Sequence, residues 1–153
     1  MAITVEWNEV FISELFDATH DITGVGAVKA ILTDGLESGG ANPFDASSDN
    51  AYSDISAQEI SAGNGYLQNT AVLAGVSIEI VSNEIVLSAT NQTWTASGGA
   101  IAGTTGMILY MEDAGVTDRV LCYIDFDATY TALTGTNLVV NLADGFVKAV
   151  PNP

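Results

Sequence analysis

The fold is decided by two neighbouring stretches, Gly106-Met107-Ile108-Leu109-Tyr110-Met111-Glu112-Asp113 and Val120-Leu121-Cys122-Tyr123-Ile124-Asp125-Phe126. Successive side chains of a strand point to opposite faces. The odd-numbered residues of the first stretch from Met107 onward should therefore share one face. In the second stretch the even-numbered residues Val120, Cys122, Ile124 and Phe126 should share a face. Residues 113–118 between them have turn chemistry, so the pattern predicts an antiparallel hairpin.

Other apolar runs bounded by turn residues predict further strands. They cover Val28–Thr33, Leu73–Ile80, Glu84–Ala89, Gln92–Thr95, Asn137–Leu142 and Gly145–Val150. The last two are expected to form a hairpin across an Asp-Gly turn. Because many short strands alternate with turns, we expect an all-β fold, an antiparallel β-sandwich of jelly-roll-like type over residues 23–153.

Residues 1–22 are expected to form an N-terminal arm. Alternation of Ile3, Val5 and Trp7 predicts a short strand, and Asn8 is placed to cap a short helix over about residues 9–18. The arm either docks on its own core or reaches a neighbouring molecule. Because aromatic side chains dominate interface anchors, the predicted partner-binding residues are Trp7, Phe11 and Phe16.

The charge balance excludes several classes of partner. Nineteen acidic residues face three basic ones among 153 residues, giving a net charge of −16. Direct binding of nucleic acid or of an anionic membrane is not expected, since both need clustered Lys and Arg. The acidic surface either keeps free molecules soluble and apart, or meets a basic partner or divalent cations.

The loop over residues 34–51 is long and polar, which is typical of a functional or mobile segment. Asp45, Asp49 and Asp54 are the weak candidates for a calcium site, although their spacing is not that of an EF-hand. A solvated acidic loop is the simpler interpretation. Residues 52–60 are expected to form a helical turn capped by Ser53 or Asp54.

No catalytic constellation is visible, and we expect neither an enzyme nor a cofactor. The single histidine, His20, has no nucleophile context near it. Asp125 and Asp127 could be mistaken for a carboxylate pair, but no titratable partners cluster with them in sequence. Cys122 lies on an apolar strand face and is expected to be a small buried side chain.

A glycan-binding module remains an alternative, because exposed aromatic side chains on β-sandwiches often stack on sugars. Trp94 and Tyr130 are the candidates, although core packing explains them equally well. The N-terminus lacks the basic and apolar regions of a signal peptide, and no run of about 18 apolar residues predicts a membrane span.

Several blocks resemble a family of small acidic proteins encoded among the structural genes of tailed bacteriophages. The blocks are Val28–Asp34, Tyr52–Ile60, Gly63–Tyr66, Trp94–Gly99, Tyr110–Asp113 and Tyr123–Phe126, and together they span about residues 26–150. Residues 1–22 depart from the simple start of that family, which leaves the docking site of the arm open.

The resemblance implies a virion structural role without catalytic residues. The leading expectation is a capsid decoration (cement) protein, assembled in the bacterial host cytoplasm and placed on the capsid surface. Its expected partners are the major capsid protein and itself, as a homotrimer. The alternative is a neck, collar or tail-fibre attachment protein, which copy number would distinguish.

Overall fold

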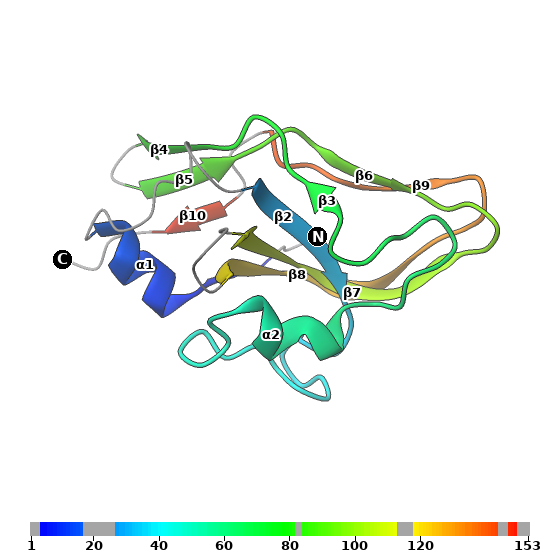
Figure 1. Ribbon diagram of the computed structural model, residues 1–153, viewed down its shortest axis with the longest axis horizontal. Coiled ribbons are helices and arrows are strands. Elements are labelled where there is room, and N and C mark those ends of the chain that lie inside the picture. Colours follow the sequence, from blue (N-terminus) through cyan, green and yellow to red (C-terminus); the bar gives the residue numbers. More distant parts are fainter. Residues whose placement is uncertain (1–3, 17–26, 82–83, 113–117, 144–146, 150–153) are drawn as a thin grey trace.

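The computed structural model describes residues 4–16, 27–81, 84–112, 118–143 and 147–149 (Figure 1). Strands far outnumber helices in these described residues, and every strand pairing among them is antiparallel. The all-β expectation is therefore confirmed. No helix in the described ranges is long and apolar enough to cross a bilayer.

Ten strands are present in the described residues, with two short α-helices and one 3₁₀ turn. In chain order they are β1 (Thr4–Trp7), α1 (Glu9–Phe16), β2 (Ala27–Thr33), α2 (Tyr52–Ile55), the 3₁₀ turn Ser56–Gln58, β3 (Ala71–Val72), β4 (Ser77–Val81), β5 (Glu84–Ser88), β6 (Gln92–Thr95), β7 (Ile101–Glu112), β8 (Arg119–Ala132), β9 (Asn137–Val140) and β10 (Val147–Ala149).

The predicted hairpin is β7 and β8, and it forms the centre of a five-stranded sheet. The order of that sheet is β1-β8-β7-β2-β3. The register aligns Ile108 with Tyr123 and Leu109 with Cys122. Both strands run well beyond the stretches that predicted them, because β7 begins at Ile101 and β8 continues to Ala132. The hairpin prediction is therefore confirmed, with strands longer than expected.

A bulge at Leu121 corrects the predicted faces of β8. Leu109 pairs with Cys122, but the next residue of β7, Tyr110, pairs with Val120. A bulge of this kind interrupts the period-two alternation. Val120 therefore shares the face of Tyr123, while Leu121 joins the opposite face with Cys122. The prediction that Val120 faces the same way as Cys122 was wrong.

Both faces of the central sheet are buried, which explains the nearly unbroken apolar runs in its strands. Strands β4, β5, β6 and β9 lie on one side, while the loop over residues 34–51 and α2 lie on the other (Figure 1). From outside the sheet, the first side contributes Leu87, Ala89, Trp94, Ala96, Val140 and Leu142 to one buried cluster. The other side contributes Leu36, Phe44 and Ile55 to a second cluster.

The long polar loop is thus a cover for the sheet, which its composition did not indicate. Leu36 is 1% and Phe44 8% exposed, and the Phe44 amide donates a hydrogen bond to the Leu36 carbonyl (3.0 Å). These two side chains anchor an otherwise polar segment over Tyr123, whose ring centroid lies 5.6 Å from that of Phe44.

The described part of the N-terminal arm is built into the chain's own sheet. Strand β1 pairs with β8, with Val5 opposite Ile124. The Asn8 side-chain oxygen accepts a hydrogen bond from the Phe11 amide (2.9 Å), so the predicted helix cap is confirmed. The boundary predicted at residues 22 and 23 lies outside the described residues.

The two smaller sheets confirm some pairings and correct one. Strands β4 and β5 pair with each other, as expected. The expected final hairpin is wrong, because β9 pairs with β6 and β10 pairs with β5. An Asp-Gly turn signal describes only local geometry, whereas the pairing of β9 with β6 places Val140, and Leu142 just after it, in the first buried cluster.

Candidate functional site

A buried carboxylate, Glu59, joins α2 to residues 66–69 beside the central sheet. It is 6% exposed, yet three donors reach it: the Tyr52 hydroxyl (2.6 Å), the Tyr66 hydroxyl (2.7 Å) and the Asn69 amide (2.8 Å). The Tyr66 hydroxyl also accepts a hydrogen bond from the Leu32 amide (3.1 Å). A buried carboxylate needs several donors to offset its loss of water, and Glu59 has them.

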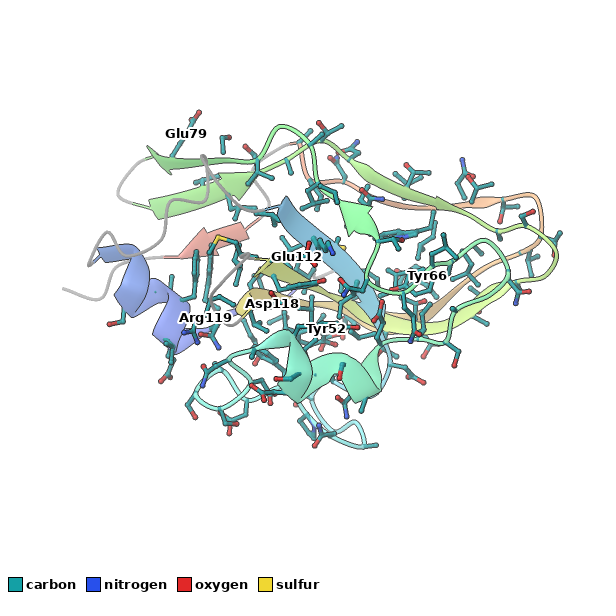
Figure 2. All side chains as sticks on the ribbon, in the orientation of Figure 1. Tyr52, Tyr66, Glu79, Glu112, Asp118 and Arg119 are labelled. Carbon is teal, nitrogen blue, oxygen red and sulfur yellow. The ribbon has the colours of Figure 1, made fainter. Side chains whose placement is uncertain are left out.

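Lys29 extends this Glu59 network along β2. The Lys29 ammonium donates to Glu112 (2.6 Å) and to the Asn69 side-chain oxygen (3.2 Å), which also accepts a hydrogen bond from Tyr110. The side chain of Lys29 is only 11% exposed, whereas that of Glu112 is 44% exposed. Figure 2 labels Tyr52, Tyr66 and Glu112 of this region. The sequence blocks around these residues therefore share a structural role that links three segments of the chain.

The tyrosines of the network are donors and not bases. Burial, followed by the hydrogen bond to Glu59, raises the pKa of Tyr52 and of Tyr66 above the usual range. Burial and the charge of Glu112 raise the pKa of Tyr110. All three hydroxyls stay protonated at neutral pH, so none can act there as a general base.

A polar hollow of about 500 Å³ lies beside the network. Asp34, Gln58, Glu59 and Tyr66 are among its lining residues. The oxygens of Glu59 and the hydroxyl of Tyr66 are already engaged in hydrogen bonds within the chain. The hollow therefore offers a ligand few free polar groups from the network.

A second hollow, of about 300 Å³, is lined by acidic side chains from segments far apart in sequence. We call it the acidic hollow, and its residues are Glu37, Ser38, Thr105, Asp125, Asp127, Ala128 and Thr129. An irregularity between β7 and β8 forms its wall. Thr104 pairs with Tyr130 and Gly106 with Asp125, so Thr105 alone faces residues 126–129. Such bulges re-aim side chains beside functional sites.

Local hydrogen bonds fix two of the three carboxylates of the acidic hollow. Glu37 accepts a hydrogen bond from the Thr105 hydroxyl (2.7 Å), which holds the pKa of Glu37 below its ordinary value. Asp125 accepts a hydrogen bond from the Asp127 amide (2.8 Å). Asp127 itself has a φ of +57°, a conformation uncommon for residues other than glycine.

The aromatic side chains predicted to bind a partner differ in how deeply they are buried. Phe11 is completely buried in the first cluster, and Trp7 stacks on it at 6.1 Å between ring centroids. A partner could contact Phe11 only if α1 moved. Trp7 is partly exposed, and the side chain of Phe16 lies outside the described residues. A partner-binding role for these residues stays a prediction.

The calcium candidates serve local backbone geometry. Asp45 accepts hydrogen bonds from the Ser47 amide (2.9 Å) and hydroxyl (2.6 Å), and Asp49 accepts one from the Asp45 amide (2.8 Å). Asp54 accepts a hydrogen bond from the Ala51 amide (2.9 Å) at the start of α2. The described residues contain no group of three or more His, Cys, Asp or Glu side chains that could hold a metal ion.

The remaining candidates pack in or against the core, or lie outside the described residues. Trp94 is 6% exposed and packs in the first cluster, while Tyr130 packs edge-on against Phe126. Burial leaves Trp94 no exposed ring face for a sugar, whereas Tyr130 is partly exposed. Cys122 is fully buried, and burial raises the pKa of its thiol, as expected for a structural cysteine. His20 lies outside the described residues.

Sequence reasoning missed Glu37 as a neighbour of Asp125 and Asp127. The residues are about 90 positions apart, and Glu37 comes from the loop that was expected to be solvated. The apolar residue Leu36 beside it was the one signal available in the sequence, because an apolar residue in a polar loop often anchors the loop to the core.

Comparisons with protein-family models, curated proteins and solved structures find no match to this chain.

Proposed function

We propose that this protein is a non-enzymatic structural component of a bacteriophage virion, with capsid decoration as its leading role. One observation carries the proposal: the buried polar side chains Lys29 and Glu59 are engaged in internal hydrogen bonds, whereas the acidic hollow opens at the surface. An arrangement of this kind suits a contact module better than a catalyst. The resemblance of the sequence blocks to acidic phage proteins supports the same role.

The architecture supports a role that needs a rigid body. A sheet with both faces covered leaves little internal freedom, and we propose that the layers form a jelly-roll-like β-sandwich. In the proposed role, copies of the chain, arranged as homotrimers, sit over gaps between major capsid subunits. Each contact of roughly 1,600 Å² would add enough buried area for stable attachment.

The net charge of −16 bears on the partner. A strongly acidic protein associates fastest with a surface that carries an excess of Lys and Arg. We therefore propose that the contacted face of the capsid is basic. Neither nucleic acid nor an anionic membrane fits this charge.

Virions of the phage that encodes this chain provide the test. Cryo-electron microscopy of purified particles, with copy number from quantitative mass spectrometry, should show a regular array on the head and hundreds of copies. Density confined to the neck or tail, with about a dozen copies, would replace decoration by the attachment role. Absence of the protein from purified virions would overturn both.

A further inference from the structure

The charges of this chain are distributed unevenly along its length. Residues 60–78, 85–111 and 128–143 contain no charged side chain, although the chain has nineteen acidic and three basic residues. The large apolar side chains that stand exposed in the described residues all lie in these three segments. They are Leu67, Val72, Leu133 and Val139. Exposed apolar side chains in surroundings without charge are typical of an interface, because interface cores are depleted in charged residues.

Two of these exposed side chains belong to one continuous uncharged surface. Strands β6 and β9 and the turn from β8 into β9 form this surface, which we call the neutral ribbon, and it lies at the end of the molecule opposite α1 (Figure 1). Its exposed residues include Thr93, Thr95, Leu133, Asn137 and Val139. Because Thr93 pairs with Val139 and Thr95 with Asn137, the four strand residues share one outward face.

Strand β9 also offers an open backbone edge. Among the described strands it pairs only with β6. The Ala96 amide donates a hydrogen bond to the Thr136 carbonyl (2.9 Å), and in this register the amide and carbonyl groups of Asn137 and Val139 point away from β6. Such an edge is ready to pair with a strand from another molecule.

The outer edge of β6 is less accessible than that of β9. The turn at residues 63–66 lies along it, and there the Ser97 amide donates a hydrogen bond to the Asn64 carbonyl (2.8 Å). A Cβ atom on Gly65 would come within 2.2 Å of the Thr95 carbonyl oxygen, so this turn packs directly on β6. Of the two ribbon strands, β9 is therefore the one with a free edge.

Other edge strands of the described structure are protected in ways that β9 is not. A charged side chain on an edge strand opposes pairing between molecules, and so does a very short strand. Glu6 lies in β1, Glu79 in β4 and Lys148 in β10, while β3 has only two residues. Strand β9 (Asn137–Val140) has four residues and no charge. The ribbon therefore lacks the usual protection against association.

We propose that copies of this chain bind one another through the neutral ribbon, with the outer edge of β9 and the side chains of Leu133 and Val139 in the contact. Two molecules that each carry a net charge of −16 repel each other. The repulsion is smallest where the uncharged segments meet, and a second copy supplies the same unpaired edge. A basic partner is drawn instead to the acidic segments, so it does not compete for the ribbon.

The number of copies rests on the proposed function, in which the chain forms homotrimers, whereas the contact surface depends only on this chain. In a homotrimer three ribbons would meet around the axis. The acidic segments would then remain free for a basic surface of the capsid.

Sedimentation velocity of the isolated chain, over a wide range of protein and salt concentrations, tests the contact. Oligomers should form as the protein concentration rises. Added salt should strengthen their formation, because it screens the repulsion between acidic molecules. A chain that stays monomeric at every protein concentration, in high salt as well, would overturn the proposal.

A matched pair of variants locates the contact. Val139→Glu should raise the dissociation constant of the oligomer about tenfold or more, because it places like charges opposite each other in the contact. Val72→Glu is the control, since it adds the same charge at a valine of nearly equal exposure on β3 (53% against 54%), and it should have a much smaller effect. Equal effects of the two variants, or unchanged association in Val139→Glu, would overturn the ribbon as the contact.

A third variant keeps the test independent of strand stability. Leu133 is 65% exposed in the turn before β9, outside any strand, so Leu133→Glu should weaken association without changing the unfolding midpoint in urea. Unchanged association in this variant would remove the turn from the contact.

Hydrogen exchange tests the part assigned to the backbone edge. The amides of Asn137 and Val139 should exchange more slowly at protein concentrations that favour the oligomer, because a neighbouring molecule then supplies their acceptors. Exchange at both amides that does not depend on concentration would overturn pairing through β9.

Virions separate this contact from the proposed function. Oligomers in solution without incorporation into particles would reject the phage role and leave the ribbon contact intact. A regular array of separate monomers on the head would overturn the ribbon contact and leave attachment to the capsid intact.

Discussion

Glu59 and Glu37 both come from the segment between β2 and β3, but the surroundings of their carboxylates differ. Glu59 is buried and receives three hydrogen bonds from within the chain. Glu37 receives one side-chain hydrogen bond and faces a hollow with two further acids. The difference teaches that burial of a carboxylate is tolerated where several donors are supplied, and that carboxylates with fewer donors stay in contact with water.

The largest effect is expected at Glu59. Glu59→Ala leaves two tyrosine hydroxyls and a backbone amide without their acceptor, so the free energy of unfolding should fall by about 3 kcal/mol. Urea unfolding at neutral pH measures it. Glu59→Gln keeps the shape and one acceptor oxygen, and should lose about half as much. A loss below about 1 kcal/mol in Glu59→Ala would show that the network does not hold α2 to residues 66–69.

The next effect concerns the Tyr123 ring, which packs against Gly106. In Gly106→Ala the added methyl group would lie 2.3–2.6 Å from ring atoms and the hydroxyl of Tyr123, so the ring must move. Overpacking of this kind costs about 2 kcal/mol. In a Tyr123→Leu background the same glycine substitution should cost less than about 0.5 kcal/mol, since contacting residues couple. Equal costs in both backgrounds would contradict the close packing of Tyr123 on Gly106.

Lys29 tests the part of the Glu59 network that faces the sheet. Lys29→Met preserves the apolar stem but removes the donor to Glu112 and Asn69, and should lower the free energy of unfolding by about 1 kcal/mol. Because Glu112 is half exposed, water compensates part of the loss. Increased stability in Lys29→Met would show that burying the ammonium costs more than its contacts return.

The smallest effect is a pH dependence at Glu37. Its pKa is lowered from 4.5 by the Thr105 hydrogen bond, so this contact contributes stability above the unfolded pKa and loses it as pH falls through the folded pKa. Thr105→Val should raise the pKa of Glu37 toward 4.5 and remove a few tenths of a kcal/mol at neutral pH. NMR titration of the Glu37 carboxylate carbon measures it, and an unchanged pKa would exclude Thr105 as its cause.

Local patterns predicted the elements of this fold better than their partners. The hairpin, the β1 strand and the Asn8 cap depend on residues close in sequence, and all three are confirmed. The last expected hairpin failed because the choice of partner strand depends on which apolar faces remain to be covered. The bulge at Leu121 escaped notice because an unbroken apolar run carries no mark of a skipped residue.

For the two candidate sites as well, the sequence showed individual residues but not which of them come together. The sequence singled out the blocks that contain Lys29, Tyr52, Glu59 and Tyr66, but it assigned them no common role. Asp125 and Asp127 were noticed as a pair and set aside for lack of neighbours. Their neighbour Glu37 comes from a loop whose path depends on the burial of Leu36 and Phe44.

By itself the sequence determined an all-β chain, its central hairpin, its acidic character and the burial of Cys122, because composition and period-two alternation follow from local chemistry. Only the tertiary structure decided that both faces of the hairpin are covered, that Glu59 accepts three hydrogen bonds, and that Glu37 lies in one hollow with Asp125 and Asp127. Those outcomes depend on contacts between residues tens of positions apart, and such contacts are set by how the whole chain buries its apolar surface.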